Sequence, residues 1–364
     1  MYRHLLVVCL LLITGCEQPR DQPGEFRLID ALGGNPDTGF ARATAVRPLR
    51  FPQDHGPHPA FRNEWWYLTG NLRADDGQAF GFQVTFFRIA LRPDPVSTAS
   101  AWRTRQIWMA HAALSDLSRG EHLTDERFAR QANQLAGASA EPFRVWLENW
   151  QLAAVDKSDA WRLRLPAAGF ELDLTLKPLS PIILQGDRGL SQKSAAAGNA
   201  SHYYSIPRLQ ASGRIGREDA QVSVSGLAWL DREWSTSALG PQQTGWDWFS
   251  LQLSDGRNLM YYQLRRRGGG VDTHSSGSLS DHQGLIRRLG PADVSLTPLA
   301  HWQGYPIEWR LQLQGEPRPW RVRALLEDQE MRLSLRYWEG AVEVVSEADG
   351  SVLGRGYLEL AGYH

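Results

Sequence analysis

The sequence predicts an all-β protein built of antiparallel strands, and three observations support this prediction. Nearly every periodic segment alternates with a period of two, which is the spacing of a strand. Windows with the 3.6-residue period of an amphipathic helix are scarce. Turn residues separate the segments, and Asp76-Gly77 and Asp255-Gly256 are typical of hairpin turns. A length of 364 residues suggests two domains.

The first residues are typical of a bacterial export signal. A basic start precedes an apolar run over residues 5–13, which is too short to span a bilayer, and small residues lead to Cys16. This pattern predicts a lipoprotein signal peptide over residues 1–15 and lipidation of Cys16, with an ordinary thiol as the alternative. Glu17 favours the outer membrane. We therefore expect a protein anchored by lipid on the periplasmic side of the cell envelope.

The next segment, residues 16–48, contains several Pro, Gly and Asp residues and predicts a tether between the lipid and the folded part. The only other cysteine, Cys9, lies in the predicted signal peptide. The mature chain is thus expected to fold on its core alone, without a disulfide.

Charge and aromatic content restrict the partners. The chain has 39 basic and 40 acidic residues, and this balance gives no indication of a nucleic-acid partner. It also has 15 tryptophans, a density that fills wide barrels or lines pockets for apolar ligands. Most of them are expected to be simple core residues. The predicted partners are an apolar small molecule and, through the anchor, a membrane.

The strands follow from alternation, from aromatic and β-branched residues and from the turns between them. In chain order the predicted strands are residues 64–72, 79–88, 108–114, 143–152, 161–165, 170–177, 203–214, 221–230, 246–253, 259–265, 277–279, 307–314, 320–326 and 357–360. Residues 116–140 and 180–194 could each hold one short helix.

Three matches in the same order indicate that the chain repeats one antiparallel unit. The matched segments are 64–84 with 246–264, 161–165 with 309–313, and 203–230 with 337–360. This repeat predicts an N-terminal domain over residues 49–235 and a C-terminal domain over residues 236–364. Chance similarity among aromatic strands is the alternative.

The two copies differ at the candidate acid. When Gly226 is matched with Gly356, Asp231 falls opposite Ala361, and Arg336 lies near the place of His202. Acid chemistry is therefore expected in the first copy, with the second copy as a wall of the cavity or as a partner barrel.

The candidate catalytic residues lie on two predicted strands. Asp231 shares a strand face with Trp229 and Glu233, and His202 shares one with Tyr204. If both faces line one cavity, a buried carboxyl with a raised pKa could protonate a carbon–carbon double bond near neutral pH. The rings would stabilise the cation, and His202 would hold a water. The alternative is a strand end whose charges pair locally.

Further candidates for the substrate pocket are Glu64, Trp66, Arg88 and His111, in addition to Glu233. Glu64 lies in an aromatic strand, where a carboxylate must be paired or face a cavity, and Arg88 is its candidate partner. His111 is more simply a core histidine.

Other chemistries lack their motifs. The sequence around Asp54 has no third histidine at ligand spacing, and Ser223 and Ser225 lie in a plain strand without a nucleophile elbow. No metal or other cofactor is predicted.

Several of these motifs resemble the carotenoid 1,2-hydratase superfamily, and its AttH-like branch is the closer match. This branch is often labelled "predicted secreted hydrolase". The matching segments are residues 51–59, 64–70, 110–116, 203–205, 226–234 and 356–360. The resemblance covers nearly the whole mature chain and implies two lipocalin-like β-barrels in tandem. It also implies an association with ABC-transporter components.

The hydratases of this superfamily carry an acid site whose spacing His202, Tyr204, Trp229 and Asp231 match. The family has Trp and then Tyr at the two aromatic positions, whereas this chain has the reverse order. The resemblance thus implies proton chemistry and leaves the carotenoid substrate in doubt. We expect either an acid-catalysed hydratase or isomerase, or a non-catalytic lipid-binding lipoprotein that works with an ABC transporter.

Overall fold

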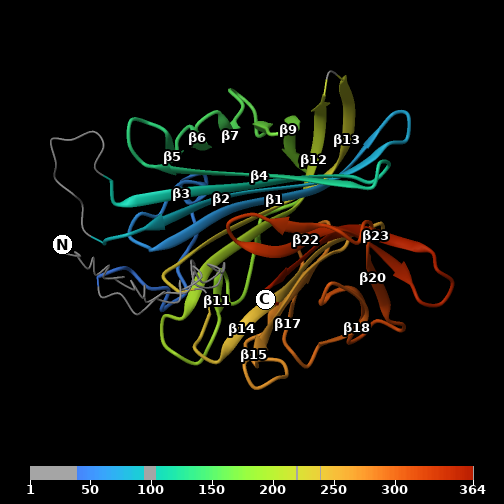
Figure 1. Ribbon diagram of the computed structural model, residues 1–364. Coiled ribbons are helices and arrows are strands. Elements are labelled where there is room, and N and C mark those ends of the chain that lie inside the picture. The colour runs from blue at the N-terminus through green and yellow to red at the C-terminus, as the bar shows by residue number, and fades with distance from the viewer. Residues whose placement is uncertain (1–38, 94–103, 219, 238, 364) are drawn as a thin grey trace, which may run out of the picture.

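The computed structural model describes residues 39–93, 104–218, 220–237 and 239–363. Apart from one short 3₁₀ turn, Gln53–His55, its regular elements are strands that form two antiparallel sheets. Each sheet curls into a barrel-like domain (Figure 1). The prediction of an all-β protein with two tandem antiparallel barrels is confirmed. Within the described residues, no helix has the length and apolar character needed to cross a membrane.

The first sheet has the strand order β4-β3-β2-β1-β13-β12-β9-β8-β7-β6-β5, with β10 and β11 paired to β12. Its strands are β1 (Asn63–Ala74), β2 (Ala79–Ala90), β3 (Gln106–Asp116), β4 (Glu121–Arg130), β5 (Ala136–Ala140), β6 (Phe143–Leu147), β7 (Trp150–Ala154), β8 (Trp161–Ala167), β9 (Phe170–Pro178), β10 (Ile183–Leu184), β11 (Leu190–Gln192), β12 (Ala200–Arg217) and β13 (Ala220–Ser235).

The second sheet has the order β17-β16-β15-β14-β23-β22-β20-β19-β18, with β21 paired to β22. Its strands are β14 (Gln243–Leu253), β15 (Asn258–Arg266), β16 (Ser276–Ser280), β17 (Ile286–Leu289), β18 (Val294–Trp302), β19 (Tyr305–Leu313), β20 (Trp320–Ala324), β21 (Glu330–Arg332), β22 (Arg336–Ser346) and β23 (Val352–Ala361).

The two sheets share one connectivity. In each, the first strand pairs with the second strand on one side and with the last strand on the other, so that β1 lies between β2 and β13 and β14 lies between β15 and β23. The three sequence matches fall on equivalent strands: β1 and β2 with β14 and β15, β8 with β19, and β12 and β13 with β22 and β23. The repeat in the sequence therefore corresponds to a repeat in topology.

Both short helices expected from the sequence are wrong. Residues 116–140 contain β4 and β5, and residues 180–194 contain β10 and β11. β4 pairs along its whole length with β3, and no other described strand pairs with it. Charged residues on such an edge strand discourage aggregation, and here they interrupted the alternation that identifies a strand.

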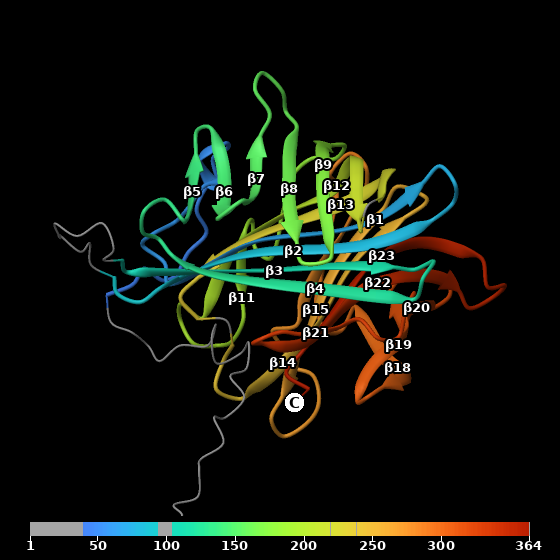
Figure 2. The same ribbon diagram turned by 45° about the horizontal axis from the view of Figure 1, so that its top comes forward.

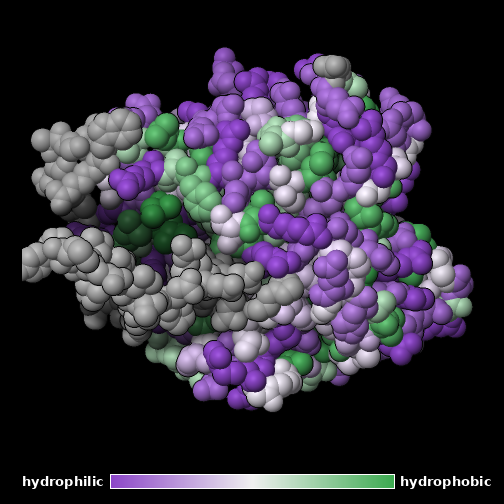
Figure 3. All heavy atoms as spheres, in the orientation of Figure 1, coloured by the Kyte–Doolittle hydropathy of each residue, from purple (hydrophilic) through white to green (hydrophobic). Residues whose placement is uncertain are grey.

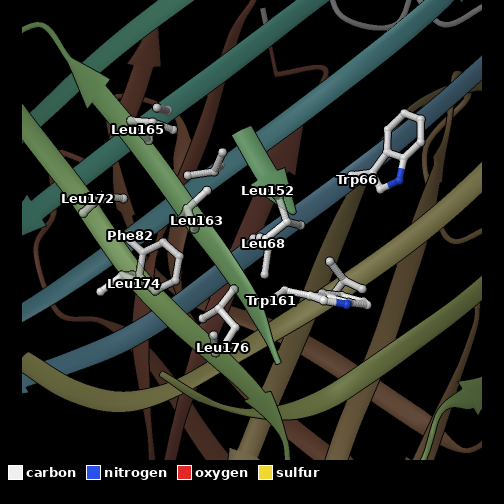
Figure 4. Packing of buried hydrophobic residues seen from close by; sticks show 14 of the residues in the cluster. Trp66, Leu68, Phe82, Leu152, Trp161, Leu163, Leu165, Leu172, Leu174 and Leu176 are labelled. Carbon is white, nitrogen blue, oxygen red and sulfur yellow. The ribbon is translucent and has the colours of Figure 1, made fainter. Parts of the chain in front are cut away.

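Each barrel has its own apolar core. In the first domain, leucines of β8 and β9 meet aromatic side chains of β1 and β2 (Figure 4). The second core gathers apolar side chains of β14, β19, β22 and β23. The two views show β22 and β23 beside β1 and β2 (Figures 1 and 2), and contacts join these pairs of strands. The outer faces of two sheets thus meet between the domains.

Candidate functional site

The site is positioned by strands that are buried on both faces. Even-numbered residues of β1, such as Trp66 and Leu68, point into the first barrel, whereas Trp65 and Tyr67 point toward the second domain. In β14 the odd-numbered residues enter the second core, and Trp246 and Trp248 point back toward the first domain. Because successive side chains alternate, each strand builds a core with one face and the interface with the other.

A narrow cavity of about 90 Å³ lies at this interface. Its walls come from both domains; half of the lining residues are aromatic, and five are acidic or basic. The lining residues are Trp65, Tyr67, Thr85, Phe87, Lys193, Tyr203, Asp231, Glu233, Leu239, Trp246, Trp248, Tyr262, Leu264, Tyr337, Glu339 and Glu359. We call this cavity the interdomain pocket.

Asp231 lies in the wall of the interdomain pocket with its carboxylate fully hydrogen-bonded. Tyr203 donates its hydroxyl proton to Oδ2, and Oδ1 accepts hydrogen bonds from Ser205 Oγ at 2.5 Å and Trp229 Nε1 at 2.7 Å. Burial raises the pKa of Asp231 to about 7, although these three hydrogen bonds lower it. Asp231 can therefore hold or release a proton near neutral pH.

The second domain supplies two further carboxyl groups. Glu359 accepts a hydrogen bond from Trp246 Nε1 at 3.0 Å, and burial together with the charges of Asp231 and Glu233 raises its pKa to about 8. Glu339 is 1% exposed, and burial and the charge of Glu359 raise its pKa well above its usual range. Both groups hold protons at neutral pH.

One ammonium group faces these acids. Lys193 Nζ lies 3.2 Å from Glu233 Oε1 and 4.0 Å from the centre of the Tyr262 ring. Its pKa is raised: burial lowers it, but the neighbouring charge of Glu233 and the contact with Tyr262 outweigh the burial. Lys193 and Glu233 therefore form an ion pair inside the wall.

The strand register relates the acids of the two domains. Asp231 pairs with Tyr67 on β1, and Glu359 pairs with Trp248 on β14. Counted from the hairpin turns at Ala74 and Leu253, Tyr67 corresponds to Trp246, whose partner on β23 is Ala361. Ala361 therefore occupies the place of Asp231, as the glycine-based match predicted. The second copy nevertheless contributes acids to the pocket at other positions, Glu339 and Glu359.

His202 and Tyr204 do not meet Asp231, and the expectation that they share its cavity is wrong. They pair with Trp234 and Arg232, whose side chains point into the first barrel. Tyr204 Oη lies 2.6 Å from His55 Nδ1, and the His202 ring packs on Trp234 and Phe61. Burial lowers the pKa of His202 to about 4, which keeps it neutral. Trp229 does contact Asp231, as expected.

Glu64, Trp66 and Arg88 also lie on the barrel side of their strands, away from the interdomain pocket. Glu64 forms buried ion pairs with Arg88, as the sequence suggested, and with Arg232 at 2.5 Å. Arg232 stacks over the Trp66 ring at 3.7 Å. This cluster joins β1, β2 and β13 at one end of the first barrel.

The loop before β1 is held by the same cluster. Arg88 donates to the backbone oxygens of His58 and Phe61, and Asp54 binds Arg47 and His58 at 2.5 and 2.8 Å. Among the residues that the structure describes, no group of three or more His, Cys, Asp or Glu side chains is arranged to hold a metal ion.

His111 lies one contact away from the interdomain pocket. Its Nδ1 is 2.8 Å from the hydroxyl of Tyr337, a lining residue from the second domain. Burial lowers the pKa of His111 to about 3, so its ring is neutral. His111 therefore couples β3 to β22, whereas Glu233 is the one member of the predicted substrate pocket that lines the cavity.

A larger cleft of about 550 Å³ opens at the mouth of the first barrel. It is lined mainly by apolar residues and prolines, including Phe143, Trp161 and Ile206, with His55 at its edge. Burial lowers the pKa of His55 to about 4. We place the candidate site in the smaller cavity because the acids with raised pKa values converge there.

Sequence reasoning missed Lys193, Trp246, Trp248, Tyr262, Glu339 and Glu359. The signal for two of them was present, because Glu339 and Glu359 are carboxyl groups in aromatic or apolar strands, as Asp231 is. Lys193 had no such signal, since it lies in an irregular segment whose path the sequence does not indicate.

Comparisons with known proteins agree with this architecture. A family model described as AttH-like matches residues 42–363. NE1406 of Nitrosomonas europaea, described as an AttH protein, is 40% identical, with a TM-score of 0.79 over 89% of this chain and 100% of that chain. No curated protein matches the sequence significantly.

Two solved structures with low identity share the fold. Kievitone hydratase from Nectria haematococca is 14% identical, with a TM-score of 0.67 over 89% of this chain and 95% of that chain. CghA with Sch210972 is 17% identical, with a TM-score of 0.52 over 92% and 99%. The family model and NE1406 confirm the resemblance to the AttH-like branch. The chain belongs to the AttH-like family.

Proposed function

We propose that the interdomain pocket binds a small apolar molecule and transfers a proton to a carbon–carbon double bond of that molecule. The observation that supports this proposal best is the position of Asp231. Its carboxyl group is 3% exposed, lies among aromatic rings, and has a pKa near 7. A group with this pKa can both give and take a proton at neutral pH, as acid–base catalysis requires.

In the proposed reaction, neutral Asp231 gives its proton to one alkene carbon, and the electrons of the double bond form the new C–H bond. The neighbouring carbon becomes a cation, which the faces of the surrounding rings stabilise by about 2 kcal/mol or more per ring in a dry site. A water oxygen then bonds to the cation, and the proton that this water loses returns to Asp231. Loss of a carbon-bound proton in place of water addition would give an isomer.

One feature supports proton transfer over hydrolysis. The only described serine that contacts Asp231 is Ser205, which donates to the carboxylate and has no histidine as base. The protein also shares its fold with a protein named kievitone hydratase. At 14% identity this likeness concerns the fold alone and says nothing of the reaction. The role expected for His202 is not part of this proposal. Its side chain points into the first barrel, so it cannot hold the attacking water.

The second candidate is a binding protein without catalysis. It is favoured by the three hydrogen bonds that Asp231 already accepts, which use both of its oxygens. In this case the pocket would carry an apolar or lipid-like molecule beside an ABC transporter.

The cell-envelope location remains part of the proposal. Cys16 and the apolar run before it lie outside the described residues, and the sequence pattern alone supports lipidation. Replacing Cys16 with Ala should release the protein from membranes into the soluble periplasmic fraction. Membrane association that survives this change would contradict the anchor.

The function is tested on the molecule that the protein carries. Native purification, solvent extraction and mass spectrometry identify it, and the purified protein is then incubated with it and assayed for a hydrated or isomerised product. Asp231→Asn should still bind the molecule but lose about 10²-fold or more in turnover. The exposed Asp349→Asn is the control and should keep full turnover. Binding without turnover by the wild-type protein would favour the carrier.

A further inference from the structure

The interdomain pocket has an unbalanced charge. It is lined by four carboxyl groups and one ammonium group, and that ammonium group forms an ion pair with Glu233. Asp231, Glu339 and Glu359 have no basic side chain among the charges that shift their pKa values. Protonation of these acids therefore relieves the charge repulsion among them.

Glu339 adds an independent sign of a ligand. Neither of its carboxyl oxygens makes a hydrogen bond of good geometry within the described residues, although Glu339 is 1% exposed and lines the cavity. Its neighbours are the hydroxyls of Tyr67 and Tyr337, which lower its pKa against the larger effect of burial, and the Tyr67 hydroxyl likewise makes no well-formed hydrogen bond in the described part of the chain. A buried carboxyl with poorly formed hydrogen bonds is costly, so a ligand group that binds Glu339 would be favoured.

The walls have the chemistry that recognises organic cations. Indole and phenol rings attract positive charge through their faces, and carboxylates supply the opposite charge. The protein already binds one cation in this way, because Lys193 lies over the rings of Tyr262 and Tyr203 at 4.0 and 5.4 Å while it pairs with Glu233. The remaining acids line the same cavity as Trp246, Trp248 and Tyr337, and no cation among the described residues lies over these three rings.

We propose that the interdomain pocket binds molecules whose apolar part carries a substituted ammonium group, held by the aromatic faces and by the carboxylates of Glu339 and Glu359. The inference names the substrate class for the pocket in which the proposed function is placed, but it does not require catalysis. A positive charge in the pocket favours the carboxylate forms, so each bound cation releases protons.

Proton release fixes the sign of the pH dependence. At neutral pH the cation must displace protons from Glu359, whose pKa is about 8, and from Glu339, whose pKa is raised well above its usual range, so affinity rises as pH rises through this range. Other titratable or charged groups that face these acids are Tyr67, His111, Glu126, Lys193, Tyr203, Asp231, Glu233, Tyr262 and Tyr337. Of these, Lys193 and Glu233 compensate each other, and His111 is neutral.

The test compares two probes of the same shape on the intact protein. Benzyltrimethylammonium carries the charge, and neopentylbenzene has a quaternary carbon in place of the nitrogen. Isothermal titration calorimetry at pH 6 and pH 9, in buffers of different ionisation enthalpy, measures affinity and the protons released. We expect the ammonium probe to bind at least about tenfold more tightly at pH 9 with proton release, and the neutral probe to show no such rise.

Variants locate the effect. Glu339→Gln, which is close in shape and leaves no ion pair broken, should weaken the ammonium probe at pH 9 and reduce the protons released. Glu343→Gln on the same strand, whose partner is the exposed Arg323, is the matched control and should bind as the wild type does. Circular dichroism and thermal unfolding check that both variants fold.

Three results would overturn the inference: no binding of the ammonium probe, equal binding of both probes at both pH values, or unchanged proton release in Glu339→Gln. None of them depends on turnover of the natural molecule. Cation binding without any effect of Asp231→Asn on turnover would leave this inference standing and remove the proposed reaction.

Discussion

Asp231 shows how one residue combines burial with hydrogen bonding. Burial raises its pKa from 3.8 to about 7, while the Tyr203, Ser205 and Trp229 donors pull the pKa down. The carboxyl group therefore titrates within the physiological range, which neither effect alone would achieve.

The raised pKa of Asp231 makes stability depend on pH. Native Asp231 keeps its proton up to about pH 7, whereas the unfolded residue loses it near pH 3.8, so the native state binds more protons between these values and stability falls as pH rises. Each unit of difference corresponds to about 1.4 kcal/mol. Asp231→Asn should therefore lose less stability between pH 5 and pH 8 than the wild type does.

Denaturant unfolding at pH 5 and pH 8 measures this difference. Asp349→Asn is the control, because the pKa of Asp349 is lowered and this exposed group does not titrate in that window. Parallel pH curves for wild type and Asp231→Asn would contradict the raised pKa.

Glu64 is the carboxylate that two buried arginines of the first barrel share. Glu64→Gln would leave Arg88 and Arg232 buried without their shared carboxylate, and breaking such a buried pair costs about 3–5 kcal/mol. Glu347→Gln, which breaks the largely exposed pair with Arg310, should cost less than about 1 kcal/mol. Urea unfolding compares the two, and equal costs would show that the Glu64 cluster contributes no more than a surface pair.

Strands were the part of this fold that the sequence predicted well. Residues 64–72, 79–88 and 246–253 all fall within observed strands, because alternation and hairpin turns are local signals. The edge strand β4 and the short strands β10 and β11 were missed, since their pairing depends on distant partners.

It was harder to predict which face of each strand lines the pocket and which enters the core. β1 and the first half of β12 are buried on both sides, so Trp65 and Trp66 are equally plausible pocket residues by composition, and Tyr203 and Tyr204 likewise. A shift of one residue exchanges the two faces of a strand. The predicted acid was therefore placed in a pocket, but its predicted partners His202 and Tyr204 were assigned to the wrong side.

Adjacent tyrosines of β12 provide a test of this alternation. Tyr203→Phe removes a hydrogen bond that lowers the pKa of Asp231, so that pKa should rise by roughly one unit, as loss of a charge-assisted hydrogen bond implies. Tyr204→Phe should leave it unchanged, because Tyr204 bonds His55 inside the barrel.

Infrared or carbon-13 NMR titration of the Asp231 carboxyl group would measure both variants. A shift in Tyr204→Phe, or none in Tyr203→Phe, would mean that the strand faces are assigned incorrectly.

At the scale of the whole molecule, the two domains are docked through specific contacts as well as through the aromatic wall. Gln252 donates to the backbone oxygens of Pro207 and Ala228 at 2.6 and 3.0 Å, and Arg208 donates to Asn258 at 2.7 Å. On the face shown in Figure 3 hydrophilic residues predominate, and hydrophobic residues lie scattered among them as well as in a hollow. The pocket therefore belongs to the assembled pair of domains.

Gly81 lies at a close approach of the two sheets. A Cβ atom there would lie 2.7 Å from both Ala341 Cβ and the Tyr357 hydroxyl, across the domain interface. Gly81→Val should therefore cost about 1–3 kcal/mol and reduce the thermal stabilisation given by a pocket ligand. Gly268→Ala, with nothing within 4 Å, is the control, and calorimetric unfolding measures both. A cost equal to that of the control would mean that the sheets can separate freely.

The division of each strand into a core face and a pocket face has a consequence for how this family can diversify. A substitution at Trp65, Tyr203 or Glu359 alters what the cavity recognises, while the neighbours Trp66, Tyr204 and Leu358 continue to fill the barrels. Mutations on the pocket face of a strand can thus change the chemistry of the cavity without disturbing the core face. Because the unit is duplicated, two such pocket faces lie opposite each other.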